Sequence, residues 1–397
     1  MRPHIHSTVS CSEVHQWALL WLMQSEVLMK KGRRSKCTPT VVWSIVLRAA
    51  ARMISVFAAC RDLANSPSQQ AVFNALLDGL PRTLPVLENR LNWAMTTAWS
   101  RGMRRRSWQV AIDWHLIPYY GEPHQSKNET TRNKQKQGTT HFHTYATACI
   151  VQYGRRYTLA LTWVRRHEST VTVVARLLAR IRELGVKIKV LLLDRAFFTA
   201  AVMAFLQEEK IAFLMPVMFR GRPPAKKKKG AKKGVKKGLH WLKRQKAGWY
   251  RHTLQHAKEP VTIKVCVSYR TYYNRKKRKR GTQKLLFAAW RVCGTPTEIR
   301  ERYRKRFGIE SSFRQIRQAR IYTCTRNPRL RLVFVAVALL LRNLWVWIHA
   351  TLLAQGRGEE MTLRLDLLRF KQMLDWIAQA VAAILHDGSM PYVDLNE

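Results

Sequence analysis

Residues 303–317 read Tyr303-Arg-Lys-Arg306-Phe-Gly-Ile-Glu310-Ser-Ser-Phe-Arg-Gln-Ile-Arg317. In one unbroken helix, four of these side chains would lie within an arc of roughly 60°: Tyr303, Arg306, Glu310 and Arg317. A neighbouring apolar stripe can face a protein core. A carboxylate beside two guanidinium groups and a phenol packs poorly in a core. A carboxylate in these surroundings is instead suited to bind a metal ion next to a bound phosphate chain.

The charge balance of the chain predicts a polyanionic partner. The 397 residues carry 71 Lys and Arg against 24 Asp and Glu, a formal net charge of +47. No small acidic ligand needs so strong a positive field, whereas nucleic acid does, and an anionic membrane surface is the second candidate. The hydrophobic content of 47% is enough for two or three domains with cores of their own.

Cysteine usage and hydropathy favour a cytoplasmic protein without a membrane partner. The seven cysteines are scattered and form no Cys-x-x-Cys pair, which disfavours a disulfide framework and a structural zinc site. The N-terminal residues contain no apolar run suited to a signal peptide. Residues 332–354 are apolar, but Arg342, Asn343 and His349 lie among them, so we expect a buried core helix rather than a membrane span. With DNA as the partner, association with the nucleoid is expected.

Residues 1–105 are expected to form a helical N-terminal domain. Apolar residues recur at helical spacing, with Pro and Gly between the segments, over residues 13–30, 39–63, 67–80 and 83–100. Such a domain could bind DNA, or it could be a helical cap whose basic residues are solvated. The sequence leaves both alternatives open.

After residue 107 the hydrophobic period becomes that of strands. Strands are predicted at 108–118, 142–151 and 157–164, the last two as a hairpin, with a polar loop up to residue 140. A helix, a buried parallel strand, a second helix and another strand should follow, over 170–184, 187–194, 199–209 and 211–217. This order predicts a mixed α/β fold in which helices cover a mixed sheet. We assign residues 106–219 to the first part of this core.

Residues 220–292 are predicted to be a basic, β-rich insert in that core. Its first part, 220–238, is of low complexity, and strands are expected at 249–254, 261–269 and 284–292. Residues 220–280 hold 23 Lys and Arg against one acid, Glu259, which favours a nucleic-acid surface over a solvated loop. The predicted DNA contacts are Lys226, Lys227, Lys228, Lys229, Arg275, Lys276, Lys277 and Arg278.

The aromatic residues of the insert have two interpretations. They could stack on unpaired bases or form the core of the insert: Trp241, Trp249, Tyr250, Tyr272 and Tyr273. After the insert, residues 293–350 should complete the core and carry the Glu310 helix. Residues 351–397 should form a helical C-terminal tail.

Acidic residues within buried strands are rare in this chain and therefore informative. Asp113 lies in the middle of a predicted strand, and Asp194 ends an apolar one. Each could simply be paired with a neighbouring base. Two adjacent strands and a covering helix can, however, bring Asp113, Asp194 and Glu310 to one point. They would then be catalytic carboxylates that bind two Mg²⁺ ions, with Mn²⁺ as a substitute.

Other chemistries have weaker support. His115, His141 and His143 share one face of their strands, which could indicate zinc, but such spacing is common among structural or solvent-facing histidines. No glycine-rich phosphate loop precedes a helix. No Gly-x-Ser-x-Gly nucleophile elbow occurs.

These residues together resemble a DDE transposase of bacterial insertion-sequence type, which has an RNase H-like core. Residues 107–345 follow the element order of that family. The resemblance is carried by Asp113 in Ala111-Ile-Asp113-Trp, by Asp194 in Leu191-Leu-Leu-Asp194, and by the pattern of residues 303–317. That pattern is similar to the Tyr-Arg-Glu-Lys signature of one branch, which also has a β-rich insert before the Glu. Arg317 stands where the branch usually has Lys, so a planar guanidinium with several N–H donors replaces a compact ammonium group.

The resemblance implies metal-dependent strand cleavage and strand transfer of an insertion sequence. It implies that Tyr303, Arg306 and Arg317 contact DNA phosphate near the cut, and that a dimer or larger assembly acts on paired element ends and target DNA. A non-catalytic DNA-binding protein derived from a transposase is one alternative, and the three acids argue against it. A structure-specific nuclease on the same fold is another. The insert and the pattern of residues 303–317 argue against that alternative.

Overall fold

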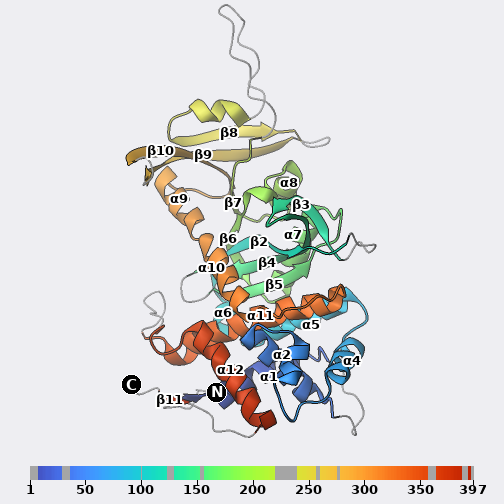
Figure 1. Ribbon diagram of the computed structural model, residues 1–397. Coiled ribbons are helices and arrows are strands. Elements are labelled where there is room, and N and C mark those ends of the chain that lie inside the picture. The colour runs from blue at the N-terminus through green and yellow to red at the C-terminus, as the bar shows by residue number, and fades with distance from the viewer. Residues whose placement is uncertain are drawn as a thin grey trace, which may run out of the picture. The chain divides into compact units, whose positions relative to one another are not determined.

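The computed structural model (Figure 1) describes residues 8–28, 36–99, 101–122, 129–152, 156–219, 239–255, 260–274, 278–355, 364–386 and 392–394. The chain divides into two compact units. Unit 1 comprises residues 1–103, 114–168 and 308–397, and unit 2 comprises residues 104–113 and 169–307. Strand β2 (Ser107–Tyr119) contributes its first half to unit 2 and its second half to unit 1.

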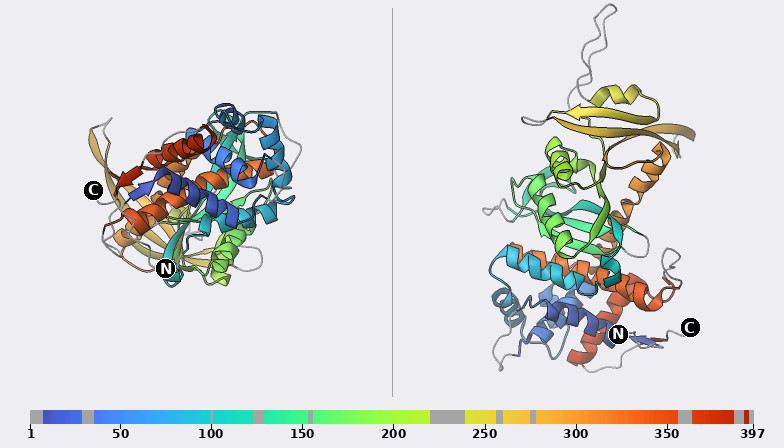
Figure 2. Two further views of the ribbon diagram at one scale, coloured as in Figure 1. Left: turned by 90° about the horizontal axis from the view of Figure 1, so that it is seen from below. Right: turned by 180° about the vertical axis from the view of Figure 1, so that it is seen from behind.

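Unit 1 is mostly helical. Its helices are α1 (Cys11–Gln24), α2 (Pro39–Arg52), α3 (Val56–Arg61), α4 (Gln69–Gly79), α5 (Leu84–Thr96), α10 (Phe307–Ile316, whose first residue belongs to unit 2), α11 (Pro328–Ile348) and α12 (Phe370–His386). The short helix α6 (Arg101–Arg104) leads into β2. Helices α1, α2 and α12 pack side by side in all views (Figures 1 and 2). Near them, β1 (Thr8–Ser10) pairs antiparallel with β11 (Tyr392–Asp394).

The predicted N-terminal helices are confirmed, with two differences. Helix α1 ends at Gln24, before the predicted residue 30, and residues 29 and 30 lie outside the described residues. Residues 39–63 form two helices, because Met53 adopts a left-handed conformation (φ 58°) that ends α2. Ser or Thr side chains cap the N-termini of α1, α2, α3 and α4, whereas Thr83 before α5 makes no such hydrogen bond. Ser10 and Glu13 form a reciprocal capping box at α1, and Ser55 caps α3.

The apolar helix α11 is a core helix, as predicted. Among the described residues, one helix is long and apolar enough to cross a membrane, Pro328–Leu353, and 94% of its most apolar window is buried inside the protein. The polar residues in its middle have protein partners. The Asn343 side chain accepts a hydrogen bond from the Thr158 amide at 2.9 Å and donates to the carbonyls of Met95 and Thr158. These bonds satisfy the amide inside the fold.

The strands of unit 1 confirm one prediction and correct another. Strands β4 (Thr139–Ile150) and β5 (Thr158–Trp163) form the predicted antiparallel hairpin. The polar loop predicted before residue 140 is wrong in part, because residues 131–136 form β3 (Thr131–Lys136), which pairs with β4. Nearly all its side chains are exposed. A strand that buries neither face shows no hydrophobic alternation, so no periodic pattern indicates it in the sequence.

Unit 2 is built on a mixed sheet. The first half of β2 pairs in parallel with β6 (Lys187–Leu193), and β6 pairs in parallel with β7 (Phe213–Pro216). Strand β10 (Lys279–Trp290) then pairs antiparallel with β7. The insert strands β9 (Val261–Asn274) and β8 (Gly248–Leu254) continue the sheet. Its helices are α7 (Thr170–Glu183), α8 (Ala200–Glu208) and α9 (Pro296–Arg304), with 3₁₀ turns at Arg195–Phe197 and Leu239–Arg244.

The predicted fold class is therefore confirmed: a mixed α/β protein with a central mixed sheet. Strand β6 is buried in its second half and lies between two parallel neighbours, as its run of leucines predicts. Because β10 pairs directly with β7, the insert strands extend the core sheet instead of forming a separate one. The proposed five-segment domain division stays a prediction.

His15 should make the stability of unit 1 depend on pH. Its ring is buried in α1, 3.1 Å from the Ser44 hydroxyl of α2, and desolvation lowers its pKa to about 4. Because the unfolded chain binds this proton from about pH 6.5 downwards and the folded protein does not, stability should fall as pH drops from 6.5 to 4, by about 3 kcal/mol at most. Urea unfolding across that pH range measures it. In His15→Gln the free energy of unfolding should depend less steeply on pH. An unchanged pH dependence would assign the effect to other groups.

Candidate active site

Asp113 and Asp194 lie at the same level on neighbouring parallel strands. Ile112 of β2 is in register with Leu193, the last residue of β6, and each aspartate is the next residue along the chain. Their side chains are 13% and 38% exposed. The two acids that the sequence singled out are thus brought together in unit 2, although they are far apart in the chain.

Arg306 lies against both carboxylates. Its Nη1 atom donates to Oδ2 of Asp113 at 2.8 Å, and its Nη2 atom lies 3.8 Å from Oδ1 of Asp194. The guanidinium side chain is only 6% exposed. Two carboxylates this close repel each other, and a shared, poorly solvated cation offsets that repulsion. The pair of aspartates therefore defines a position that accepts positive charge.

Tyr303 supports the end of β6. Its hydroxyl donates to the carbonyl of Leu193 at 3.1 Å, the residue before Asp194, and its ring lies 5.1 Å from that of Phe287. Burial raises the pKa of Tyr303, with Asp194 and Asp113 adding to the rise and Arg306 opposing it. The phenol therefore stays protonated at neutral pH and remains a hydrogen-bond donor. Its predicted contact with DNA phosphate stays a prediction.

The single helix predicted for residues 303–317 is wrong. Helix α9 ends at Arg304, a turn holds Lys305 and Arg306, and α10 begins at Phe307. In the turn, the amide of Arg306 donates to the carbonyl of Tyr303 at 2.9 Å, a short i to i−3 bond. Gly308 is a weak helix former, and the buried ion pair with Asp113 holds Arg306. Tertiary contacts therefore position Arg306, which does not share a helix face with Glu310 as predicted.

Glu310 and Arg317 belong to unit 1. Glu310 is half-buried on α10, and Arg317 is exposed at the start of a 3₁₀ turn (Arg317–Ala319). The convergence of Glu310 with Asp113 and Asp194 stays a prediction. Within the described parts of the chain, no group of three His, Cys, Asp or Glu side chains is assembled to hold a metal ion. The zinc alternative has no support in that part either, since His143 is buried with Nδ1 2.6 Å from the Glu129 carbonyl oxygen.

Asp194 of the aspartate pair lines a large basic cavity of unit 2. The cavity has a volume of about 1280 Å³, and Asp194, Tyr303 and Arg306 line it. Further basic side chains line it from the core, the insert strands and α9: Arg195, Arg270, Lys284, Arg300 and Arg304. Sequence reasoning missed these five. Two features of the sequence could have indicated some of them. Arg195 directly follows Asp194, and the four-residue spacing of Arg300 and Arg304 places both on one face of α9.

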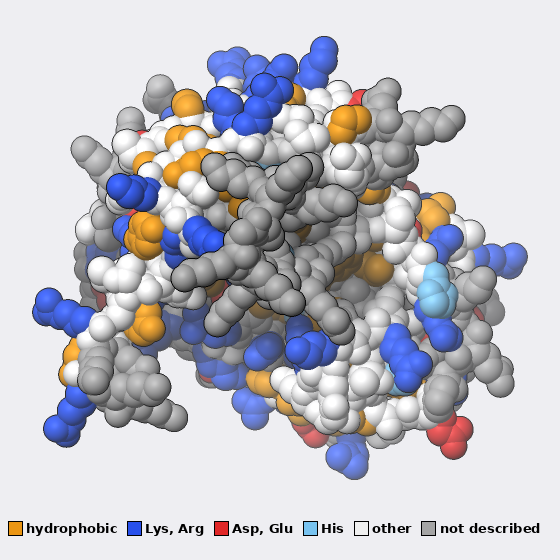
Figure 3. All heavy atoms as spheres, turned by 90° about the horizontal axis from the view of Figure 1, so that it is seen from above, with side chains coloured by type: hydrophobic (Ala, Val, Ile, Leu, Met, Phe, Trp, Pro, Cys, Tyr) orange, Lys and Arg blue, Asp and Glu red, His pale blue; other side chains and the backbone are white. Residues whose placement is uncertain are grey.

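The predicted contacts of the insert fall mostly outside the described residues. Lys226–Lys229 and Arg275–Lys277 lie there, whereas Arg278 is described and exposed, next to the start of β10. Figure 3 shows the face that contains the insert strands, where Lys and Arg side chains outnumber Asp and Glu. Positive charge dominates this face.

The insert aromatics divide into two groups. Trp249 donates to the Gly294 carbonyl at 2.8 Å, and Tyr250 packs edge-on to Trp241 at 5.8 Å. These three make internal contacts, as the core alternative expects. Tyr272 and Tyr273 are 41% and 57% exposed, which leaves them accessible to a ligand.

Residues 104–344 match the family described as Transposase DDE domain, a span that covers more than half of the chain. The chain belongs to the DDE transposase family. This transposase is a DNA-acting enzyme, and the resemblance read from its sequence is confirmed. DDE transposases use divalent metal ions, and DNA is their partner.

The fold of the transposase is also similar to a solved structure. This is the piggyBac transposase, in a cryo-EM structure of its synaptic complex with hairpin DNA. The TM-score is 0.54 at 9% sequence identity, with 94% of this chain and 78% of that chain covered. At this identity the likeness concerns the fold, which has an RNase H-like core. No curated protein sequence matches the chain.

Proposed function

We propose that this transposase cuts DNA at the ends of an insertion sequence and joins the released 3′ ends to target DNA. Asp113, Asp194 and Glu310 are its catalytic carboxylates. The observation that carries the proposal is the aspartate pair on adjacent strands, which shares the Arg306 guanidinium, while Asp194 and Arg306 line a basic cavity. Acids that accept a cation beside a phosphate-binding surface suit phosphodiester chemistry.

The donor set of the site fits hard divalent cations. Carboxylate oxygens are the ligands that Mg²⁺ and Mn²⁺ prefer, and the aspartates already lie against one buried cationic group. Asp113, Asp194 and Glu310 would hold two Mg²⁺ ions, with Glu310 assigned from the pattern of residues 303–317. Bound divalent ions supply Lewis acidity and lower the pKa of the attacking hydroxyl.

The surrounding side chains of this transposase have two tasks. Arg195, Arg300 and Arg304 bind and orient the DNA backbone in the cavity, and their guanidinium groups stabilise negative charge that develops at the reacting phosphate. The Tyr303 hydroxyl fixes the end of β6 through the Leu193 carbonyl and thereby positions Asp194. We further infer that Arg306 and Arg317 contact phosphate near the cut. The protein would act as a homodimer or larger assembly on paired ends, in the cytoplasm at the nucleoid.

A cleavage assay tests the proposed function against its two alternatives. The purified full chain is incubated with labelled DNA from the flanks of its gene, plus a target plasmid, in the presence of Mg²⁺, Mn²⁺ or EDTA. Metal-dependent cleavage followed by joined products is the expected result. Cleavage without joining would indicate a nuclease, and tight binding without cleavage would indicate a non-catalytic DNA-binding protein.

The basic insert should supply affinity for any DNA sequence. Replacing Lys226–Lys229 with Gln should weaken binding to element-end DNA and to random DNA alike, because binding to phosphate carries no sequence information. The slope of log K against log salt should become shallower by about 0.9 for each phosphate that the variant no longer neutralises. Affinities across a salt series for both DNAs measure this. If end preference disappears while the slope is unchanged, the insert reads sequence and the assignment is wrong.

A further inference from the structure

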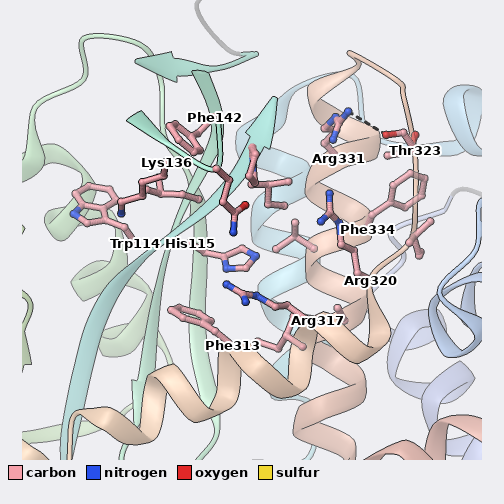
Figure 4. A pocket seen from close by; sticks show the side chains of 18 residues that line it. Trp114, His115, Lys136, Phe142, Phe313, Arg317, Arg320, Thr323, Arg331 and Phe334 are labelled. Carbon is pink, nitrogen blue, oxygen red and sulfur yellow. Dashed lines mark hydrogen bonds between the residues drawn. The ribbon is translucent and has the colours of Figure 1, made fainter. Parts of the chain in front are cut away.

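A second cavity lies wholly within unit 1. Its volume is about 690 Å³, and it is bounded by the second half of β2, the β3–β4 turn, α10 and α11 (Figure 4). This volume lies within the range of small-molecule binding sites. None of the aspartates or the glutamate of the proposed catalytic site lines it.

One part of the cavity wall is cationic. Among the described residues, four Lys and Arg side chains line the cavity and no carboxylate does: Arg317, Arg320 and Arg331 on this part of the wall, and Lys136 beside Trp114 (Figure 4). Arg331 is buried and forms part of the wall, since it donates to the carbonyls of Thr325 at 2.6 Å and Thr323 at 3.3 Å. In Figure 4, Arg317 reaches from the end of α10 toward His115, and Arg320 lies between Arg317 and Arg331. Forked guanidinium donors in a wall that holds no acid suit a phosphate group.

The other part of the wall is aromatic and apolar. The His115 ring lies 5.0 Å from that of Phe313, with an angle of 37° between their planes. Further aromatic and aliphatic side chains line the same cavity: Trp114, Phe142, Ile316 and Phe334. A bare inorganic anion needs no such surface, whereas a planar ring gains contact area from it. The imidazole adds hydrogen-bonding nitrogen atoms beside the rings.

We propose that this cavity binds a single nucleotide. Arg320 holds its phosphate, and its base lies against Phe313 and His115. Two sources have this chemistry: a soluble mononucleotide, or an unpaired nucleotide of DNA already bound to the transposase. None of the residues that line the proposed site lines the basic cavity of unit 2. Nucleotide binding is measured without divalent metal. The proposed nucleotide site can therefore be wrong while strand cleavage is confirmed, and strand cleavage can be absent while nucleotide binding is confirmed.

The test is binding of deoxyadenosine monophosphate to the full chain by calorimetry, in EDTA and at elevated salt to screen surface charge. One nucleotide per chain should bind, more tightly than deoxyadenosine or inorganic phosphate. Arg320→Gln should weaken this binding about tenfold or more. Arg314→Gln is the matched control, because Arg314 is an exposed arginine of α10 that does not line the cavity, and it should bind like the parent.

Three results would overturn the proposal. These are no binding of the nucleotide, equal weakening by Arg314→Gln and Arg320→Gln, or inorganic phosphate binding as tightly as the nucleotide. Competition then separates the two sources. If a duplex with one unpaired nucleotide displaces the mononucleotide better than a fully paired duplex does, the occupant comes from DNA. If the two duplexes compete equally, the occupant is a soluble nucleotide.

Discussion

Asp194→Asn should lower metal-dependent strand cleavage on the order of 10³-fold or more and leave DNA binding nearly unchanged. An amide keeps the size of the side chain but removes the charge that binds a divalent ion. DNA affinity comes mostly from the many basic side chains, so it should persist. Asp113→Asn and Glu310→Gln should behave alike. The measurements are cleavage of end-containing DNA and affinity for the same DNA.

Asp194 is the cleanest of the three positions, because its carboxylate is partly exposed and 3.8 Å from Arg306. Asp113→Asn also weakens the 2.8 Å pairing of Arg306, so circular dichroism must show that this variant is folded. Glu183→Gln is a matched control, since Glu183 pairs with Arg180 on α7 and does not line the basic cavity. A variant of any proposed catalytic acid that cleaves like Glu183→Gln would remove that acid from the site.

Arg306→Gln should destabilise unit 2 by about 3 kcal/mol. The substitution leaves the Asp113 carboxylate, 13% exposed and beside Asp194, without its guanidinium. The double variant with Asp113→Asn should cost less than the sum of the single changes, because the carboxylate that paired with Arg306 is then neutral. Urea unfolding gives the overall destabilisation, and hydrogen exchange of the β6 amides reports unit 2 itself.

Arg304→Gln provides the comparison for this second result. Arg304 also precedes α10, but its side chain is 74% exposed, and its pairing with Glu301 at 3.2 Å is solvated. Its removal should change stability by no more than about 0.5 kcal/mol. Equal stability of Arg304→Gln and Arg306→Gln would mean that the buried pair contributes no net stability.

The pattern of the sequence was sufficient for the elements around the two aspartates. Alternation predicted β2 and the β4–β5 hairpin, and an unbroken run of leucines predicted the parallel strand β6. These signals are local, because burial of one or both strand faces dictates which residues can stand there. The same reasoning singled out Asp113 and Asp194, since a carboxylate in a buried strand is costly without a partner.

Residue patterns alone were enough to predict the mixed α/β fold, the two strand acids, the basic surface and the membership of the transposase family. The packed fold was needed to show that Arg306 leaves the helix and lies against both aspartates, and that the Tyr303 hydroxyl donates to the Leu193 carbonyl. It was also needed to show that β3 is a strand and that aromatic residues and arginines enclose a cavity in unit 1. Periodicity reports which face of an element is buried. An ion pair between residues 193 positions apart depends on strand register and on a turn, and neither leaves a repeating pattern in the sequence.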